Sequence, residues 1–237
     1  MKKIIPILVG CILAINTTTL AQKKAVPATN NALYSSNAIA TDPCFEPDSL
    51  TVSKTNKMLE EAHYWNIIAA SLKETSNQED QELFLVSQLE KLTPEEIIGF
   101  RLRTDQLLYD TYNSELWCAA YIINHGCSDG GFEYFRCWLL SRGKKVFYDA
   151  KANPDSLLAV LDKEKKEYEF EGFWYVAVNA FKNTTQKELF NFIDYETFTT
   201  NDENYPILKF SWNIENPQTM QQICPVLYAN LWLQHDK

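Results

Sequence analysis

The chain has 237 residues, of which 46% are hydrophobic and 13% aromatic, and its 31 acidic and 22 basic side chains give a net charge of −9. This much apolar and aromatic surface excludes a disordered chain. Seven glycines and the lack of a lasting heptad pattern exclude collagen-like and coiled-coil proteins. The acidic balance argues against nucleic acid as a partner, because neutralising phosphates requires a basic face.

Residues 1–21 have the pattern of a secretory signal peptide. Lys2 and Lys3 give a positive start, residues 4–15 are apolar, and Thr19-Leu20-Ala21 places small residues where a signal peptidase cuts. The apolar stretch is too short for a convincing transmembrane helix. We therefore expect an exported protein, periplasmic or secreted, with no transmembrane segment in the mature chain. Cleavage removes two lysines and leaves 20 basic against 31 acidic residues, a net charge of −11.

A lipid anchor is the alternative for the same N-terminal region. Leu8-Val9-Gly10-Cys11 resembles a lipobox, which would place a lipid on Cys11. Against it, the apolar run before Cys11 is short and continues past the cysteine. Cleavage and release is the preferred interpretation.

Residues 22–56 are predicted to be a linker or loosely ordered arm, because they are rich in small and polar residues and lack an apolar period. Residues 57–237 are predicted to form one domain. Its length of roughly 180 residues is ordinary for a single domain and sufficient for a real core.

Helical periodicity begins near Met58, with apolar residues three and four positions apart, and recurs from Leu85. Thr93-Pro94-Glu95-Glu96 has the signature of a capping box and predicts the start of a third helix. A fourth helix over 114–124 is so apolar that we expect it to be buried. Ser128 is predicted to cap a fifth, which ends near Gly143.

Later elements are less regular. Asn153-Pro154-Asp155 predicts another helix cap, and two further helices are expected around residues 173–180 and 220–231. Pro225 should kink or split the last one. Residues 195–213 are irregular, with one possible short strand at 207–212. The expected fold class is all-α, a single domain of about seven or eight helices.

The order of motifs in the domain resembles a known family. Tyr112 to Leu157 reads YNSELWCAAYIINHGCSDGGFEYFRCWLLSRGKKVFYDAKANPDSL. This run, preceded by the segments 64–68 and 92–97 and followed by Trp212 and Cys224-Pro225, is similar to the bacterial family called domain of unknown function 4240. The resemblance implies a helical fold but no activity. The family usually has a second Asp after Ser-Asp, whereas this chain has Gly130. This difference weakens any role of paired acids in binding a cation or polar ligand. The export signal and the N-terminal arm are further departures from the family pattern.

The turn at residues 126–136 is the most interesting candidate site, with Ser128, Asp129 and Arg136 as binding residues. In a functional interpretation, the helix N-terminus and the Arg136 guanidinium attract an anion. In a structural one, Ser128 caps the helix, Asp129 complements its dipole, and Arg136 pairs with Glu133 or Asp129. Two large aromatic residues at helical spacing, Trp117 and Trp138, could line a groove beside this turn. They complete the set of predicted binding residues.

Catalytic and metal sites have weaker signals. Cys127 next to His125 suggests a cysteine nucleophile, but no orienting group is identifiable. The cysteines lack the close pairs of structural zinc sites, and no nucleotide or hydrolase motif occurs, so no metal, cofactor or catalytic residue is predicted. After cleavage five cysteines remain, and export would permit one or two disulfides of undetermined pairing: Cys44, Cys118, Cys127, Cys137 and Cys224.

We therefore predict a non-catalytic exported module that binds an unknown protein or a small polar ligand through residues 126–136. The alternative is an uncharacterised hydrolase or transferase with its polar site at Asp129 and Arg136. An enzyme should show a concave pocket with a perturbed titratable group at this turn. A binding module should show an exposed apolar patch or a groove.

Overall fold

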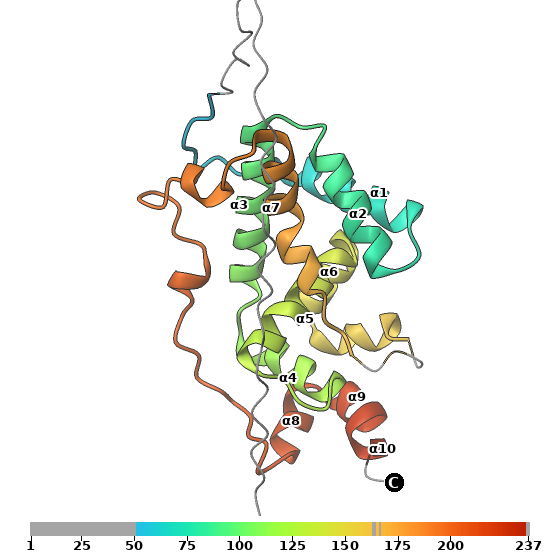
Figure 1. The fold of residues 1–237 in the computed structure, drawn as a ribbon. Helices are drawn as coiled ribbons and strands as arrows, with labels where there is room; N and C mark the ends of the chain where they lie inside the picture. Colours follow the sequence, from blue (N-terminus) through green and yellow to red (C-terminus); the bar gives the residue numbers. More distant parts are fainter. Residues whose placement is uncertain (1–50, 163–164, 166, 236–237) are drawn as a thin grey trace, which may run out of the picture. The chain divides into compact units, whose positions relative to one another are not determined.

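This computed structural model describes residues 51–162, 165 and 167–235 (Figure 1). Within that part of the chain, seven helices have nine or more residues. They are α1 (Glu61–Glu74), α2 (Gln78–Leu89), α3 (Pro94–Asp110), α4 (Ser114–Ile123), α5 (Asp129–Ser141), α6 (Lys144–Ala152) and α7 (Glu171–Thr185). Only two isolated β-bridges occur among these described residues, and no strand. The expected all-α single domain is confirmed.

Shorter turns of helix occupy the rest of the described chain. Three 3₁₀ turns follow α6 and α7: η1 (Pro154–Val160), η2 (Leu189–Phe192) and η3 (Asp202–Asn204). The C-terminal turns are α8 (Gln218–Ile223), α9 (Pro225–Leu227), the π-helical η4 (Tyr228–Trp232) and α10 (Leu233–His235). As predicted, the last apolar repeat is split at Pro225, since proline cannot continue the hydrogen-bond ladder.

Side-chain caps begin the helices where the sequence predicted them. The backbone N–H of Glu96 donates to the Thr93 hydroxyl at 3.3 Å, while the Glu96 carboxylate accepts from the N–H of Thr93 at 3.0 Å. The Ser128 hydroxyl accepts from the N–H of Gly131 at 3.1 Å. Each contact satisfies a donor that the first helical turn leaves without an intrahelical partner.

Two local features differ from the sequence expectation. Helix α6 was not predicted, because only Phe147 and Ala150 on its inner face are fully buried while lysines cover its outer face. The possible strand at 207–212 does not form, and Ile207 is 97% exposed. A strand needs a partner to take its backbone hydrogen bonds, whereas this segment is attached through side chains such as Trp212, whose Nε1 donates to the carbonyl of Ser114 at 2.8 Å.

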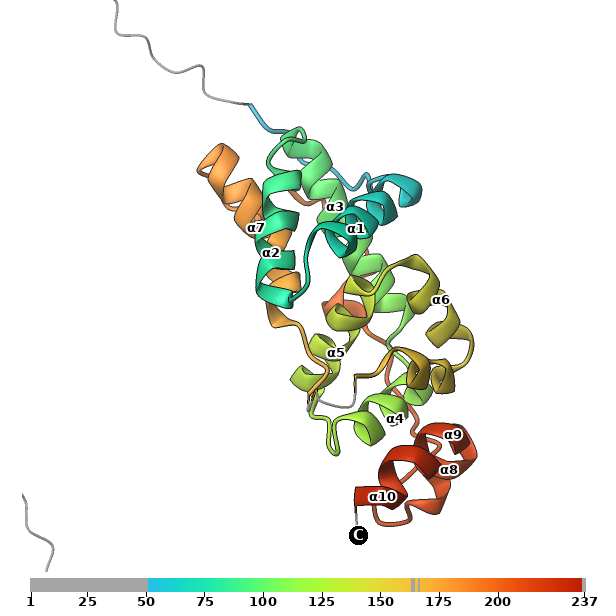
Figure 2. The same cartoon turned by 90° about the vertical axis from the view of Figure 1, so that its right-hand side faces the viewer.

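The core lies where α3, α5 and α7 pack on one another, with α2 on α7 and α1 on both α2 and α3. Helix α4 contacts α5 and the C-terminal turns, which lie beside it in two perpendicular views (Figures 1 and 2). Its predicted burial is confirmed, since Leu116, Cys118, Ala119 and Ala120 are all buried. None of the described helices is long and apolar enough to cross a membrane.

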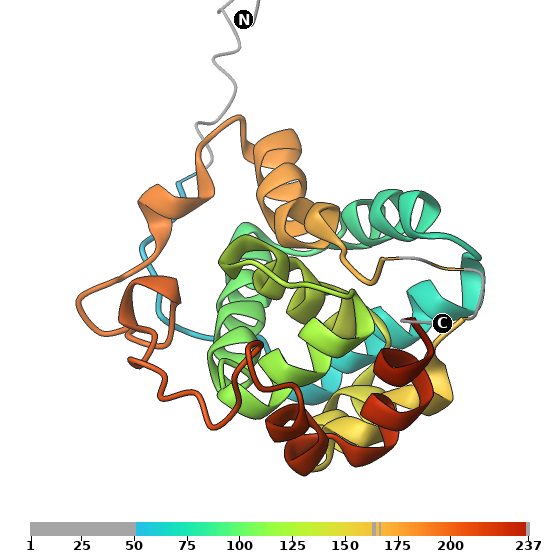
Figure 3. The ribbon, with the colours of Figure 1, turned by 90° about the horizontal axis from the view of Figure 1, so that it is seen from below.

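A long irregular segment returns from the end of α7 to α8 along the side of α3 and α4 (Figure 3). We call residues 195–213 the return segment. Immediately before this segment, Thr55 exchanges backbone hydrogen bonds with Phe192 and Asp194, so the chain just before α1 also packs there. The expected signal peptide, the lipid alternative at Cys11 and Cys44 lie outside the described residues.

Candidate functional site

Helix α5 divides the predicted site residues between two opposite faces. Successive residues on an α-helix are rotated by 100°, so Arg136 and Trp138 point in nearly opposite directions. Arg136 and Phe132 share the face toward α3, α4 and the return segment. Trp138 lies on the other face, near Arg142 at the end of the helix.

At the turn itself, Ser128 and Asp129 are exposed, and Ser128 caps α5. His125 adopts a positive φ of 53°, and its ring stacks 6.3 Å from that of Trp232. Burial and the nearby Glu169 carboxylate raise the pKa of Cys127 to about 12. A nucleophilic cysteine needs the opposite shift, because the thiolate is the reactive form. This environment therefore does not favour Cys127 as a nucleophile.

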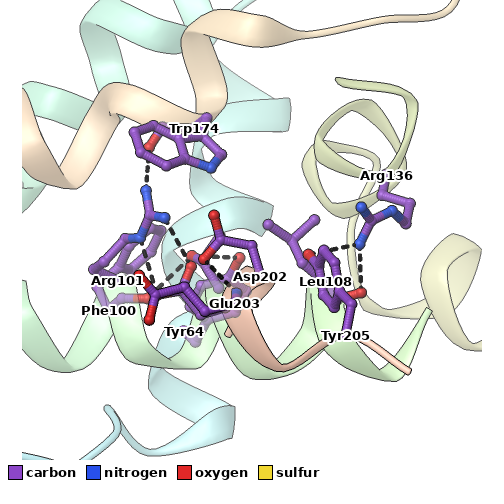
Figure 4. Close-up of polar contacts among 11 residues, drawn as sticks. Tyr64, Phe100, Arg101, Leu108, Arg136, Trp174, Asp202, Glu203 and Tyr205 are labelled. Carbon is purple, nitrogen blue, oxygen red and sulfur yellow. Dashed lines mark hydrogen bonds and ion pairs between the residues drawn. The ribbon is translucent and has the colours of Figure 1, made fainter. Parts of the chain in front are cut away.

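Arg136 is 1% exposed and forms none of the expected ion pairs. It forms no ion pair with Asp129 or Glu133, nor with any other carboxylate of the described residues. Its Nη1 donates to the carbonyl of Leu108 at 2.6 Å and to the Tyr205 hydroxyl at 2.9 Å (Figure 4). The structural interpretation is thus wrong about the partner: the buried guanidinium turns inward to neutral acceptors, while Asp129 stays in solvent.

Aromatic rings complete the surroundings of Arg136. The guanidinium carbon lies 5.1, 4.7 and 4.9 Å from the ring centres of Tyr112, Phe132 and Tyr205, distances at which a cation is attracted by a ring face. Trp117 joins this cluster by stacking on Phe132 with centroids 4.5 Å apart. Two of the five predicted site residues, Arg136 and Trp117, therefore contact the return segment, through Tyr205 and Phe210 respectively.

The opposite face of α5 borders a cleft of about 800 Å³, which we call the α2–α5 cleft. It lies between α2, the end of α5 and the chain before α7, of which Val160, Asp162, Lys165 and residues 167–172 line it. Trp138 forms part of its wall and makes an edge contact with Tyr168 at 5.0 Å. The charged or polar side chains that line it and are at least partly buried include Thr75, Gln78, Gln81, Glu82, Arg142, Lys165 and Glu169.

Arg142 is the half-buried cation of this cleft, and burial lowers its pKa. Its Nε and Nη2 donate to the Ser141 hydroxyl at 3.1 and 3.0 Å, and Nη2 also donates to Gln81 Oε1. Gln81 is itself 1% exposed and fixed by bonds from its amide to Ser71 Oγ and to the Ser141 carbonyl. In the described part of the chain, Nη1 of Arg142 has no hydrogen-bond acceptor and the guanidinium has no carboxylate partner.

A second cation lies near the first. Burial, followed by the positive charge of Arg142, lowers the pKa of Lys165, whose ammonium donates to Gln78 Oε1. Burial, followed by Glu167 and Glu171, raises the pKa of Glu169. Each of these groups is thus in an environment that disfavours its charged form, and a ligand of opposite charge would relieve that.

Gly172 explains how a carboxylate from α2 reaches the start of α7. A methyl group on Gly172 would lie 1.9 Å from Oε2 of Glu82, so the carboxylate rests against this glycine and would have to move if a larger residue stood there. The site there is compatible with a negative charge, because the N-terminal turn of a helix is its positive end. Glu82 therefore adds an acidic group to the wall of the cleft.

The sequence prediction included Trp138 but missed Arg142, Gln81 and Lys165. A signal existed for Gln81, which stands at a core-facing position four residues before the predicted apolar positions of α2. Nothing in the sequence joins it to Arg142, which is 61 positions later. Across the described residues, no three His, Cys, Asp or Glu side chains are arranged to hold a metal ion.

The fold and the site together define the class of protein: an all-α domain with a polar cleft beside its fifth helix. The model of the family described as a protein of unknown function, DUF4240, matches residues 59–183, and the chain belongs to this family. That match includes α1 to α7 almost completely, and with them every wall of the α2–α5 cleft. No curated protein and no solved structure matches the chain.

Proposed function

We propose that this chain is a non-catalytic binding module whose α2–α5 cleft takes a small zwitterion carrying a carboxylate, such as a free amino acid or a short peptide. The observation that carries the proposal is Arg142, a half-buried guanidinium facing a cleft of about 800 Å³ with an unused donor and no carboxylate partner among the described residues. Clefts of this size are typical of small-molecule sites.

The charges of the cleft match a ligand with both signs. Arg142 and Lys165 supply donors for a carboxylate, and the planar guanidinium suits that group because it can bind both oxygens. Glu82 and Glu169 supply acceptors for an ammonium group. Trp138 and Tyr168 are the buried aromatic residues of the lining, and they support the polar groups from behind rather than offering a ligand a large apolar surface.

This proposal keeps α5 as the binding helix but moves the contact surface to the face opposite Arg136. The Arg136 side chain is 1% exposed, and its Nε and Nη1 donate to Phe132, Leu108 and Tyr205. Burial therefore keeps it from a ligand in this arrangement. The hydrolase or transferase hypothesis at Asp129 and Arg136 has no supporting observation of comparable weight, since the adjacent Cys127 has a raised pKa.

Calorimetric titration of the full chain with single amino acids and dipeptides tests the proposal. We expect saturable binding by members of this panel and none by N-acetylated amino acid amides, which lack both charges. Arg142→Gln should weaken binding by about tenfold or more, the effect of losing one charged hydrogen-bond pair. Lys209→Gln, which removes an exposed cation of the return segment, should leave binding unchanged. Binding that survives Arg142→Gln, or no binding by any panel member, would overturn the proposal.

We also propose export with cleavage after Ala21. The support is the pattern of residues 1–21 alone. N-terminal sequencing of the protein recovered from cells carrying the full gene should begin near Gln22. A chain that begins at a lipid-modified Cys11 would support the lipid anchor instead, and retention of residues 1–21 would contradict export.

A further inference from the structure

Two buried thiols meet where the C-terminal turns pack on α4. Cys118 lies within α4, and Cys224 lies at the junction of α8 and α9; both are 0% exposed. The Sγ atom of Cys118 is 4.0 Å from the carbonyl oxygen of Met220. The backbone N–H of Cys224 donates to that same oxygen at 2.8 Å. One carbonyl therefore brings the two cysteines together from distant parts of the chain.

The electrostatics of Cys224 show that the side chains also interact. The hydrogen bond with the Cys118 thiol is the largest cause that raises the pKa of Cys224, followed by burial. By contrast, the groups that shift the pKa of Cys127 and of Cys137 include no cysteine. Among the described thiols, Cys118 and Cys224 are thus the pair in contact, and both are free in this structure.

The position of the pair gives a crosslink a clear structural role. The turns after Pro217 are three to six residues long, and helices so short are marginal without tertiary packing. They are attached through a few buried side chains, among them Met220, Cys224 and Leu227. In the chain-entropy account, a bond that closes a loop of about 100 residues restricts the unfolded chain strongly.

We propose that Cys118 and Cys224 form a structural disulfide when the chain folds under oxidising conditions, fixing the C-terminal turns to α4. The oxidant is a disulfide, either a small molecule such as oxidised glutathione or the active-site disulfide of an oxidase. One thiolate attacks a donor sulfur to give a mixed disulfide and a first donor thiolate; the second cysteine thiolate then displaces the other donor sulfur. The net change is one protein S–S bond formed, one donor S–S bond reduced and two protons transferred from the cysteines to the donor thiols.

The burial of both cysteines determines at which stage of folding this thiol–disulfide exchange can occur. Exchange requires an accessible thiolate, and both cysteines are buried in the folded chain. The bond therefore forms while the C-terminal turns are still open, and once they close it is protected from small reductants. This inference concerns the α4 seam only and does not depend on the ligand proposed for the α2–α5 cleft.

Oxidative refolding of the full chain tests the pairing. The protein is unfolded in reductant, refolded in a glutathione redox buffer, alkylated and digested without reduction. We expect peptide mapping to find residues 118 and 224 linked, and the urea midpoint to be higher than that of protein refolded and kept in dithiothreitol. A crosslink between other cysteines, or full alkylation of all thiols, would overturn the proposal.

Matched variants locate the effect. Cys224→Ala should abolish the difference in urea midpoint between the oxidised and the reduced protein. Cys137→Ala removes another fully buried thiol, on α5, and should retain both the link and the difference. If Cys224→Ala does not fold, the comparison of oxidised with reduced wild type still decides, because it uses the native sequence alone.

Discussion

The two faces of α5 each carry an arginine, and the two arginines differ in burial and in hydrogen-bond partners. Arg136 is sealed under the return segment, with two carbonyls, one hydroxyl and three aromatic rings around its guanidinium. Arg142, six residues later, is half-buried, anchored by Ser141 and Gln81, and left with an unused donor toward a cleft. The same residue type on one helix thus serves packing on one side and is free to bind on the other.

A third arginine shows that the interior has another solution for a buried cation. Arg101 on α3 pairs with Asp105, with Nη2 and Oδ1 2.9 Å apart, and its guanidinium lies 3.7 Å from the centre of the Trp174 ring (Figure 4). Burying a charge is costly unless it is compensated. Arg101 is compensated by a carboxylate, Arg136 by neutral acceptors and ring faces, and Arg142 by partial exposure to water.

The largest expected effect is that of Arg136→Ala. Truncation leaves a cavity and removes the donor for the Leu108 carbonyl and the Tyr205 hydroxyl, which should cost about 3–5 kcal/mol. Arg142→Ala should cost about 1 kcal/mol or less, because its guanidinium is partly hydrated. Urea unfolding of the two variants measures this difference. Equal losses would mean that the two faces of α5 do not differ as described.

Arg136→Met separates volume from charge in this comparison. Methionine fills much of the same space but donates no hydrogen bond. We expect it to recover part of the loss seen with alanine. Recovery of the full stability would show that the hydrogen bonds of Arg136 contribute nothing net.

A smaller effect is expected from Tyr205→Phe, which tests how the return segment is attached. The change removes the hydrogen bond from Arg136 and keeps the ring stack with Tyr112, whose centroid is 4.1 Å away. A loss of about 1–2 kcal/mol in urea unfolding is expected for one charged hydrogen bond. Tyr109→Phe is the matched control, since Tyr109 contacts the same ring without a hydroxyl bond to it. If both variants behave alike, the attachment is by packing alone.

The sequence predicted what depends on local chemistry. Capping boxes, proline positions and apolar periods act within a few residues, so the starts at Thr93 and Ser128 and the break at Pro225 are confirmed. Helix α6 was missed because its short inner face carries little apolar period between lysines. The family resemblance is confirmed over residues 59–183.

The partners of Arg136 and Arg142 were beyond the sequence for a physical reason. The structural interpretation paired Arg136 with an acid on its own helix, yet its partners Leu108 and Tyr205 are 28 and 69 positions away. Gln81 is 61 positions from Arg142. Such contacts arise from how helices pack, which a period does not specify. The binding role of Ser128, Asp129, Arg136, Trp117 and Trp138 stays a prediction, and the cleft shares only Trp138 with that set.

The smallest effect concerns Glu169 and its dependence on pH. Because burial raises the pKa of this carboxyl in the folded state, the folded chain binds its proton more tightly than the unfolded chain does. Stability from this group is therefore present at acid pH and lost as pH rises through the folded pKa. Glu169→Gln should be more stable than wild type at pH 7 by a few tenths of a kcal/mol at most, since the group is largely hydrated, and equal to it below about pH 4.

Glu61 is the natural opposite to Glu169. Burial alone would raise its pKa, but hydrogen bonds from Tyr148, Trp65 and Lys144 hold the pKa below its usual range. Glu61→Gln should therefore be less stable than wild type at pH 7, and the difference should vanish as pH falls through the folded pKa. Urea midpoints at several pH values measure both signs. A ligand whose ammonium group binds at Glu169 would favour the ionised carboxylate and so cancel the stability advantage of Glu169→Gln. The pH profile of the urea midpoints is therefore repeated with a bound amino acid. Loss of the advantage indicates that Glu169 contacts the ligand, and an unchanged advantage indicates that it only lines the cleft.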